Sequence, residues 1–224
     1  MSYACSSLLL LLAPTAFAQD ALTARQILER VRDTYTNVRQ FDIAGALELT
    51  NPRVRVPFRL VYQYPDKLRM EGSMGGPGAQ SGGTVITDGR TTWNYDAELN
   101  TYTRQAGPPD LDLDMGDDEL AQLGIDPSSP AVVKFAEMQL ATYRKLATLA
   151  GSATLLRTDT VQLAGIPVEC YVVETQEKPP TKEVWWIDTR QYRILRMEGT
   201  ADKSTMRLNF NKVSLNVSVR GTTG

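Results

Sequence analysis

Hydrophobic positions near the start of the chain recur at the spacing of a helix. Apolar residues three or four positions apart share one face of an amphipathic helix, and this spacing is found at Ile27, Val31, Tyr35 and Val38. The preceding stretch Thr23-Ala24-Arg25-Gln26 has the form of a capping box, which supplies partners to the free N–H groups of a first helical turn. The pattern predicts a helix that begins near residue 23 and packs on another apolar layer.

From residue 41 the hydrophobic period changes to two, which is typical of half-buried strands. The clearest case is segment 54–62, where one face is predicted to carry Val54, Val56, Phe58, Leu60 and Tyr62. Similar alternation predicts strands at 41–49, 67–72, 84–87, 90–95, 101–104, 153–160, 168–175, 182–187, 192–199 and 205–217. Asp88-Gly89 is a hairpin signal between two of them. A long helix is predicted at 130–150, and a helical turn near 118–123.

These elements predict a mainly β protein with α-helices. The expected architecture is a single curved antiparallel sheet of about 10–11 strands, an open and unclosed β-barrel. The two one-sided helices can bury their apolar stripes only against the hollow of that sheet, so they should lie over its concave face as a lid. Two narrow stripes do not fill such a hollow, and an apolar cavity on the order of several hundred Å³ is therefore expected.

The N-terminal residues have the form of a secretory signal peptide. An apolar run from Ser6 to Pro14 precedes Ala16-Phe17-Ala18, the small-x-small pattern that signal peptidase cuts. We therefore expect a signal peptide at 1–18, a single domain at 19–224, and a soluble periplasmic protein. Gln19 stands where a lipoprotein would have cysteine, so no lipid anchor is expected. The glycine-rich segment Gly72 to Gly83 should be the most mobile connection between two strands.

Charge and composition narrow the function classes. The chain has 24 Lys and Arg, 26 Asp and Glu, a net charge of −2 and no histidine, which argues against nucleic-acid binding and against imidazole-dependent catalysis or zinc binding. No enzyme activity, cofactor or metal is expected. The acidic segment 110–119 has Met115 and Ala121 where a calcium loop needs glycine and glutamate, so a solvated loop is the better interpretation. Cys170 is expected to be a small buried apolar residue.

Four segments in this order resemble the LolA/LolB/RseB superfamily: 64–71 (YPDKLRME), 85–96 (VITDGRTTWNYD), 184–188 (VWWID) and 194–198 (ILRME). The resemblance implies an open barrel with a helical lid over an apolar cavity. It also implies a carrier of lipoproteins or lipids, as in LolA-like members, or a sensor of envelope stress, as in RseB-like members. One position departs from the pattern, because Tyr64 stands where LolA itself often has an arginine.

The leading hypothesis is a periplasmic carrier for lipids or lipidated proteins. The alternatives are an RseB-like regulator that binds a membrane protein and, third, a carboxylate-based hydrolase. Expected partners are acyl chains and an inner-membrane protein complex, with the protein itself a monomer. Trp185 is expected on the outer face. The residues predicted to line the cavity are Phe58, Leu60, Tyr62, Leu68, Met70, Trp93, Tyr95, Trp186, Leu140 and Tyr143; for Trp93, Tyr95 and Trp186, a position in the sheet core against the helices is an equal alternative.

Overall fold

The computed structural model describes residues 22–73, 82–109, 116–176, 181–201 and 204–216. The predicted signal peptide, the centre of the glycine-rich segment and residues 110–115 of the acidic segment lie outside these ranges. The predictions made for them therefore stay predictions. Among the residues that are described, no helix is long and apolar enough to cross a membrane.

Eleven strands form one antiparallel sheet in the order β6-β5-β4-β3-β2-β1-β11-β10-β9-β8-β7, which confirms the predicted fold class. The sheet stays open because β6 and β7 are its two edges. Its strands are β1 Gln40–Thr50, β2 Arg53–Gln63, β3 Lys67–Ser73, β4 Gly82–Thr87, β5 Thr91–Asp96, β6 Thr101–Ala106, β7 Thr154–Leu163, β8 Ile166–Thr175, β9 Lys182–Asp188, β10 Ile194–Ala201 and β11 Ser204–Leu215.

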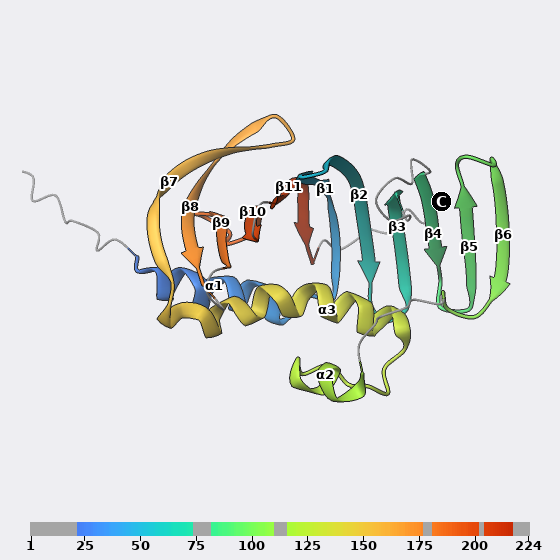
Figure 1. Cartoon of the computed structure of the whole chain (residues 1–224). Coiled ribbons are helices and arrows are strands. Elements are labelled where there is room, and N and C mark those ends of the chain that lie inside the picture. The colour runs from blue at the N-terminus through green and yellow to red at the C-terminus, as the bar shows by residue number, and fades with distance from the viewer. Residues whose placement is uncertain (1–21, 74–81, 110–115, 177–180, 202–203, 217–224) are drawn as a thin grey trace, which may run out of the picture.

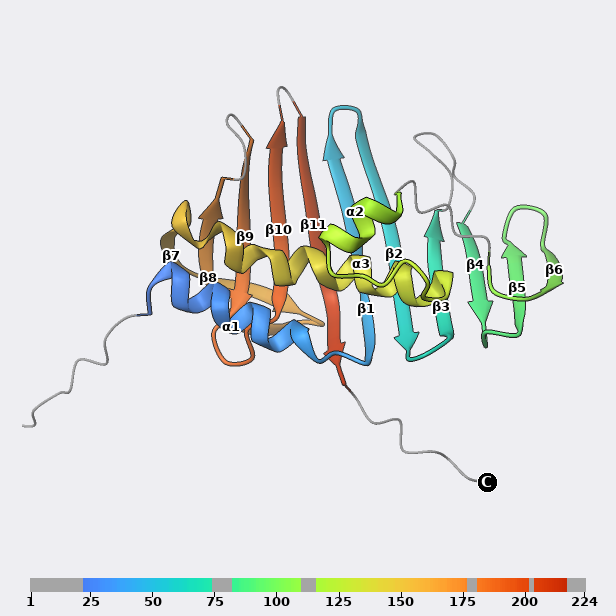
Figure 2. The ribbon, with the colours of Figure 1, turned by 90° about the horizontal axis from the view of Figure 1, so that it is seen from below.

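The helices cover one face of this sheet, which we call the helix face. They are α1 Ala24–Thr36, α2 Asp117–Gln122 and α3 Ala131–Lys145, followed by the 3₁₀ turn η1 Leu146–Gly151. Figures 1 and 2 show α3 crossing the strands from β9 to β3, with α1 running beside it. The structure thus has two layers, and its main apolar core lies between them.

Helix α1 begins as the capping pattern predicts and is anchored to the sheet. The Thr23 hydroxyl accepts a hydrogen bond from the Gln26 N–H, and the Gln26 side chain accepts one from the Thr23 N–H at 2.9 Å. Ile27 is completely buried. Further along, the Tyr35 hydroxyl accepts a hydrogen bond of 3.2 Å from the Ile194 N–H of β10. Burial raises the pKa of Tyr35 to about 12, so this phenol stays neutral.

Helix α3 packs against other elements on two sides, and it has buried apolar residues on both. Leu140 and Ala136 belong to the main core with the sheet, whereas Ala141 packs with Leu120 and Ile125 in a small separate cluster. Leu120 belongs to α2, which confirms the predicted helical turn. Helix α3 is therefore held between the sheet and α2, and its position does not depend on the sheet alone.

The opposite face of β1–β3 and β11 is charged. Asp42 accepts hydrogen bonds from Arg59 at 3.0 Å and from Lys212, and Arg59 lies 3.9 Å from Glu71. These ion pairs are partly exposed, so each contributes little to stability. These charged side chains keep this face of the sheet in contact with solvent, while the alternate, apolar side chains face the helices.

At its other end the sheet curls over its helix-free face. Strand β7 contacts β10 and β11 in addition to its partner β8, and Figure 1 shows the β7–β8 hairpin arching over the neighbouring strands. The Trp186 indole of β9 donates a hydrogen bond of 3.1 Å to Asp159 of β7, across β8. The Arg196 guanidinium lies over this indole, 5.1 Å from the ring centroid. Side chains of β7, β9 and β10 thus pack together at this curled end of the sheet.

Cys170 lies in this packed region and should not react with thiol reagents in the folded protein. Its side chain is completely buried, and burial raises the pKa of its thiol to about 12, so the reactive thiolate is scarce at neutral pH. We expect no labelling by a maleimide in buffer and complete labelling in guanidinium chloride, both followed by mass spectrometry. Rapid labelling of the native protein would contradict the burial of this strand.

Candidate functional site

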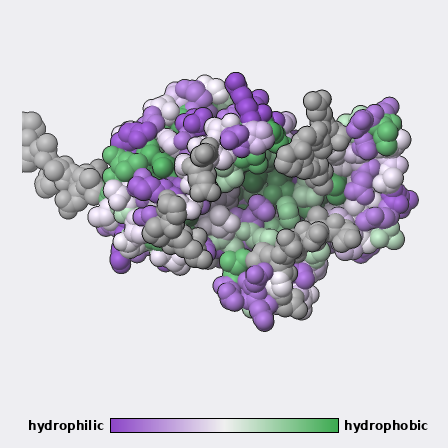
Figure 3. All heavy atoms as spheres, in the orientation of Figure 1, coloured by the Kyte–Doolittle hydropathy of each residue, from purple (hydrophilic) through white to green (hydrophobic). Residues whose placement is uncertain are grey.

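An apolar hollow of about 320 Å³ lies between the middle of the sheet and α3. Figure 3 shows apolar residues gathered in a recess near the centre of the molecule. We call this space the apolar hollow. It is lined by Ile43, Leu47, Val56, Phe58, Arg59, Leu60, Met70, Glu71, Gly72, Phe135, Gln139, Tyr143, Leu208 and Phe210.

The floor of the apolar hollow follows from strand alternation and from one glycine. Residues directly opposite each other in an antiparallel sheet share a face, and Gly45 of β1 is opposite both Phe58 of β2 and Phe210 of β11. The two phenyl rings meet edge to face across it, with centroids 5.9 Å apart. A side chain at position 45 would begin 2.1 Å from the Asn209 carbonyl oxygen. Only glycine therefore permits this close approach of β1 and β11.

The roof of the hollow is a single stripe of α3. Phe135, Gln139 and Tyr143 are four residues apart and line the same space. The Tyr143 ring contacts the Tyr35 ring of α1, with centroids 4.7 Å apart, so the two helices meet at this point. Burial raises the pKa of Tyr143, which keeps its hydroxyl neutral. The roof is thus uncharged at any physiological pH.

Four of the ten predicted lining residues come together around this hollow: Phe58, Leu60, Met70 and Tyr143. Leu140 lies beside it in the closed contact between helices and sheet, next to Tyr35 and Ile194. Tyr62 and Leu68 are on the same face but are 1% and 2% exposed, within the core under the helices.

The predicted positions of Trp93 and Tyr95 are wrong, because both lie on the face away from the helices. Met70 is opposite Val85, and Val85 is opposite Asn94, so on β5 the helix face carries Asn94 and its alternate residues. The aromatic side chains between them point to the other side. Val85 and Ile86 of β4 are both apolar, so the sequence does not indicate which of them faces the helices.

The two tryptophans of β9 are exchanged relative to the prediction. Trp185 is opposite Met197, which is opposite Leu208 of the apolar hollow. Trp185 therefore lies on the helix face, where its side chain is 2% exposed and lies near Leu146 of η1. Trp186 lies on the other face, under β7. Two adjacent tryptophans give no alternation from which their faces could be read.

Sequence reasoning also missed lining residues. Phe135 and Gln139 follow from the helical stripe that contains Tyr143, and Ile43 and Leu47 from the alternation of β1. No local signal pointed to Leu208 and Phe210, because they reach the site through the pairing of β11 with β1. Those two strands are the most distant in sequence of all the paired strands in the described structure.

The sequence and the fold were compared with those of known proteins. No family model matches the sequence, and no curated protein matches it. Among solved structures, LprF from Mycobacterium bovis is similar with a TM-score of 0.51 and 13% identity, over 90% of this chain and 97% of that chain. The chain therefore shares its fold with LprF, and its open sheet with helices over one face is the architecture expected from the LolA/LolB/RseB resemblance. At this identity the likeness concerns the fold alone.

Two further solved structures resemble this chain at lower TM-scores. The LolA superfamily protein NE2245 from Nitrosomonas europaea has a TM-score of 0.28 and 13% identity, over 88% of this chain and 95% of that chain. The MucA/MucB complex from Pseudomonas aeruginosa has a TM-score of 0.43 and 15% identity, over 87% of this chain and 57% of that chain. With TM-scores below 0.5, these two add no argument about function.

Proposed function

We propose that this protein binds an acyl chain of a lipid or of a lipidated protein in the apolar hollow, and carries it through the periplasm. The observation that supports the proposal is the hollow itself. Its volume of about 320 Å³ lies at the lower end of the usual range for ligand pockets. Its walls are mainly aliphatic and aromatic side chains from the sheet and from α3.

The size of the hollow suits one chain. If a methylene group occupies about the same volume as a water molecule in the liquid, ~30 Å³, the hollow has room for roughly ten methylene groups. Each buried methylene contributes about 0.8 kcal/mol, so a chain of this length can be held without any polar contact. Arg59 and Glu71 border the hollow, but they pair with each other on the opposite face of the sheet.

Native mass spectrometry of protein purified from the periplasm tests the proposal. We expect a population heavier than the bare chain by the mass of one lipid, which dissociates on collisional activation and is recovered by solvent extraction. Protein stripped of lipid should regain one equivalent when mixed with a fatty acid. A bare mass in both preparations, together with no uptake of fatty acid, would refute the proposal.

A further inference from the structure

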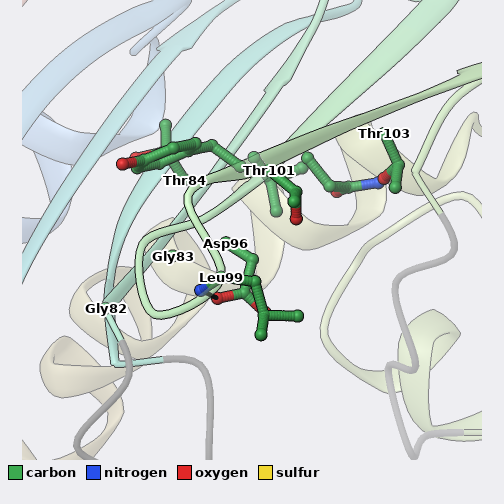
Figure 4. A pocket seen from close by; sticks show the side chains of 10 residues that line it. Gly82, Gly83, Thr84, Asp96, Leu99, Thr101 and Thr103 are labelled. Carbon is green, nitrogen blue, oxygen red and sulfur yellow. Dashed lines mark hydrogen bonds between the residues drawn. The ribbon is translucent and has the colours of Figure 1, made fainter.

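The helix face continues beyond the helices into a second hollow, of about 520 Å³, on β4, β5 and β6. We call it the polar hollow. Figure 4 shows the side chains that surround it, among them Asp96, Thr101 and Thr103. It is lined by Gly82, Gly83, Val85, Asn94, Asp96, Leu99, Thr101 and Thr103, and it is also bordered by Thr84 and Tyr95, whose side chains belong to the other face of these strands.

Strand register gathers hydrogen-bonding side chains in this hollow. Asn94 is opposite Thr103, and Asp96 is opposite Thr101, so these four side chains form one patch on the helix face. The patch continues from Val85, which is opposite Asn94. Polar side chains therefore take the places that apolar ones hold on β1, β2 and β3.

The groups of this patch are available to a ligand. Asn94, Thr101 and Thr103 make no side-chain hydrogen bond within the described part of the chain. The Asp96 carboxylate accepts hydrogen bonds from the N–H groups of Glu98 and Leu99 at 2.9 and 3.1 Å, both at Oδ1, which leaves Oδ2. The patch thus offers one amide, two hydroxyls and one carboxylate oxygen.

The charge of the polar hollow selects against anions. Among the described residues, Asp96 is the single charged one that lines it, and none of its described lining residues is a lysine or arginine. A phosphate or carboxylate placed here would meet a like charge with no cation to offset it. A hydroxyl-bearing head group can instead donate to Asp96 and exchange hydrogen bonds with Asn94 and the two threonines.

The two hollows adjoin through a pair of glycines. Met70 and Gly72 line the apolar hollow, and the residues opposite them, Val85 and Gly83, line the polar one. The pair Gly72–Gly83 has no side chains on the helix face, so within the described part of β3 and β4 no side chain separates the two spaces at that point. A chain that lies in the apolar hollow can therefore continue into the polar hollow.

We infer that the polar hollow binds the uncharged, hydroxyl-bearing head group of the amphiphile whose acyl chain lies in the apolar hollow. This inference rests on the proposed function. It assigns the ligand to neutral amphiphiles with a glycerol or sugar head, and it assigns Asn94, Asp96, Thr101 and Thr103 to head-group recognition.

Binding of ligands that share a ten-carbon chain tests the inference. Monodecanoylglycerol and decyl glucoside should bind at least about tenfold more tightly than decyl phosphate and decanol, because only they add several hydrogen bonds without an unpaired charge. The affinities are measured by displacement of a fluorescent fatty acid. The double variant Asn94→Leu/Thr103→Val should lose this preference and keep its affinity for decanol. Thr91→Val, on the other face of the same strand, should keep both.

A second pair of variants tests the passage between the hollows. Gly83→Leu places a side chain on the helix face and should weaken monodecanoylglycerol binding at least about tenfold with decanol binding unchanged. Thr91→Leu places the same side chain on the other face of β5, outside the lining of both hollows, and should have no effect.

The outcomes separate the two hypotheses. Equal affinity for all head groups, or tighter binding of decyl phosphate, would overturn head-group recognition while leaving the acyl-chain proposal intact. Failure of every ten-carbon ligand to bind would overturn both. Circular dichroism of each variant verifies that it is folded.

Discussion

Replacing Leu60 with arginine should abolish binding of a fluorescent fatty acid. Leu60 is 7% exposed on the helix face, opposite Ile43 and Met70, and it lines the apolar hollow. Burying a guanidinium without water or a counterion costs free energy. The arginine side chain, or the water that solvates it, would therefore occupy the space in which the acyl chain is proposed to bind. Losing only three methylene contacts, at about 0.8 kcal/mol each, lowers affinity about 50-fold.

The matched control is Val61→Arg, which places the same side chain on the charged face, opposite Asp42. It should bind the fatty acid like the wild type. Because a buried arginine can also unfold a protein, Val56→Trp is the second test: it fills the hollow from a half-buried position without adding charge. Normal binding by a folded Leu60→Arg and by Val56→Trp would show that the acyl chain does not use this space.

The largest effect on stability is expected from Asp188→Ala. The Asp188 side chain is 4% exposed and pairs with Arg193, with Nη2 and Oδ2 2.8 Å apart. Its other oxygen accepts hydrogen bonds from the Arg190 and Gln191 N–H groups. Arg193 in turn donates to the Val213 carbonyl at 2.7 Å. The carboxylate therefore holds the β9–β10 turn together and ties it to β11.

Removal of the carboxylate leaves the Arg193 guanidinium largely buried without its counterion. Breaking a buried ion pair in this way costs about 3–5 kcal/mol, a large part of the roughly 5–15 kcal/mol that stabilise a typical domain. Urea unfolding followed by tryptophan fluorescence measures the loss. Asp33→Ala, which removes an exposed partner of Arg32, should leave the free energy of unfolding nearly unchanged. A similar small effect for Asp188→Ala would refute the structural role.

The same pair predicts a pH dependence. Burial opposes ionisation of Asp188, but the hydrogen bonds from Arg193, Arg190 and Gln191 outweigh it, so the pKa of this carboxyl is lowered. A group with a lowered folded-state pKa stabilises the protein above its unfolded pKa of about 3.9, and this contribution is lost as the pH falls through the folded value. The difference in stability between wild type and Asp188→Ala should therefore be constant near neutrality and shrink below about pH 4.

Local patterns in the sequence determine much of this protein. The capping box at Thr23 and the helical stripes predict α1 and α3, because a helix repeats its faces within a few residues. The alternation in segment 54–62 predicts which side chains of β2 face the helices. Phe58 and Leu60 follow from it directly, because the alternate positions of this strand include the charged residues Arg53, Arg55 and Arg59.

Tertiary structure alone decided the remaining positions. Alternation relates the side chains within one strand, but the register of strand pairing sets which of its two faces meets the helices. Trp93 and Tyr95 follow a glycine-rich connection and a strand with adjacent apolar residues, and they lie beyond the reach of α3, so hydrophobicity did not favour the covered face. The face of Trp186 could not be read from the sequence because its neighbour Trp185 is equally apolar. Phe210 lines the hollow only because β11, near the end of the chain, pairs with β1. The site is therefore made by pairings between distant segments, which no local pattern records.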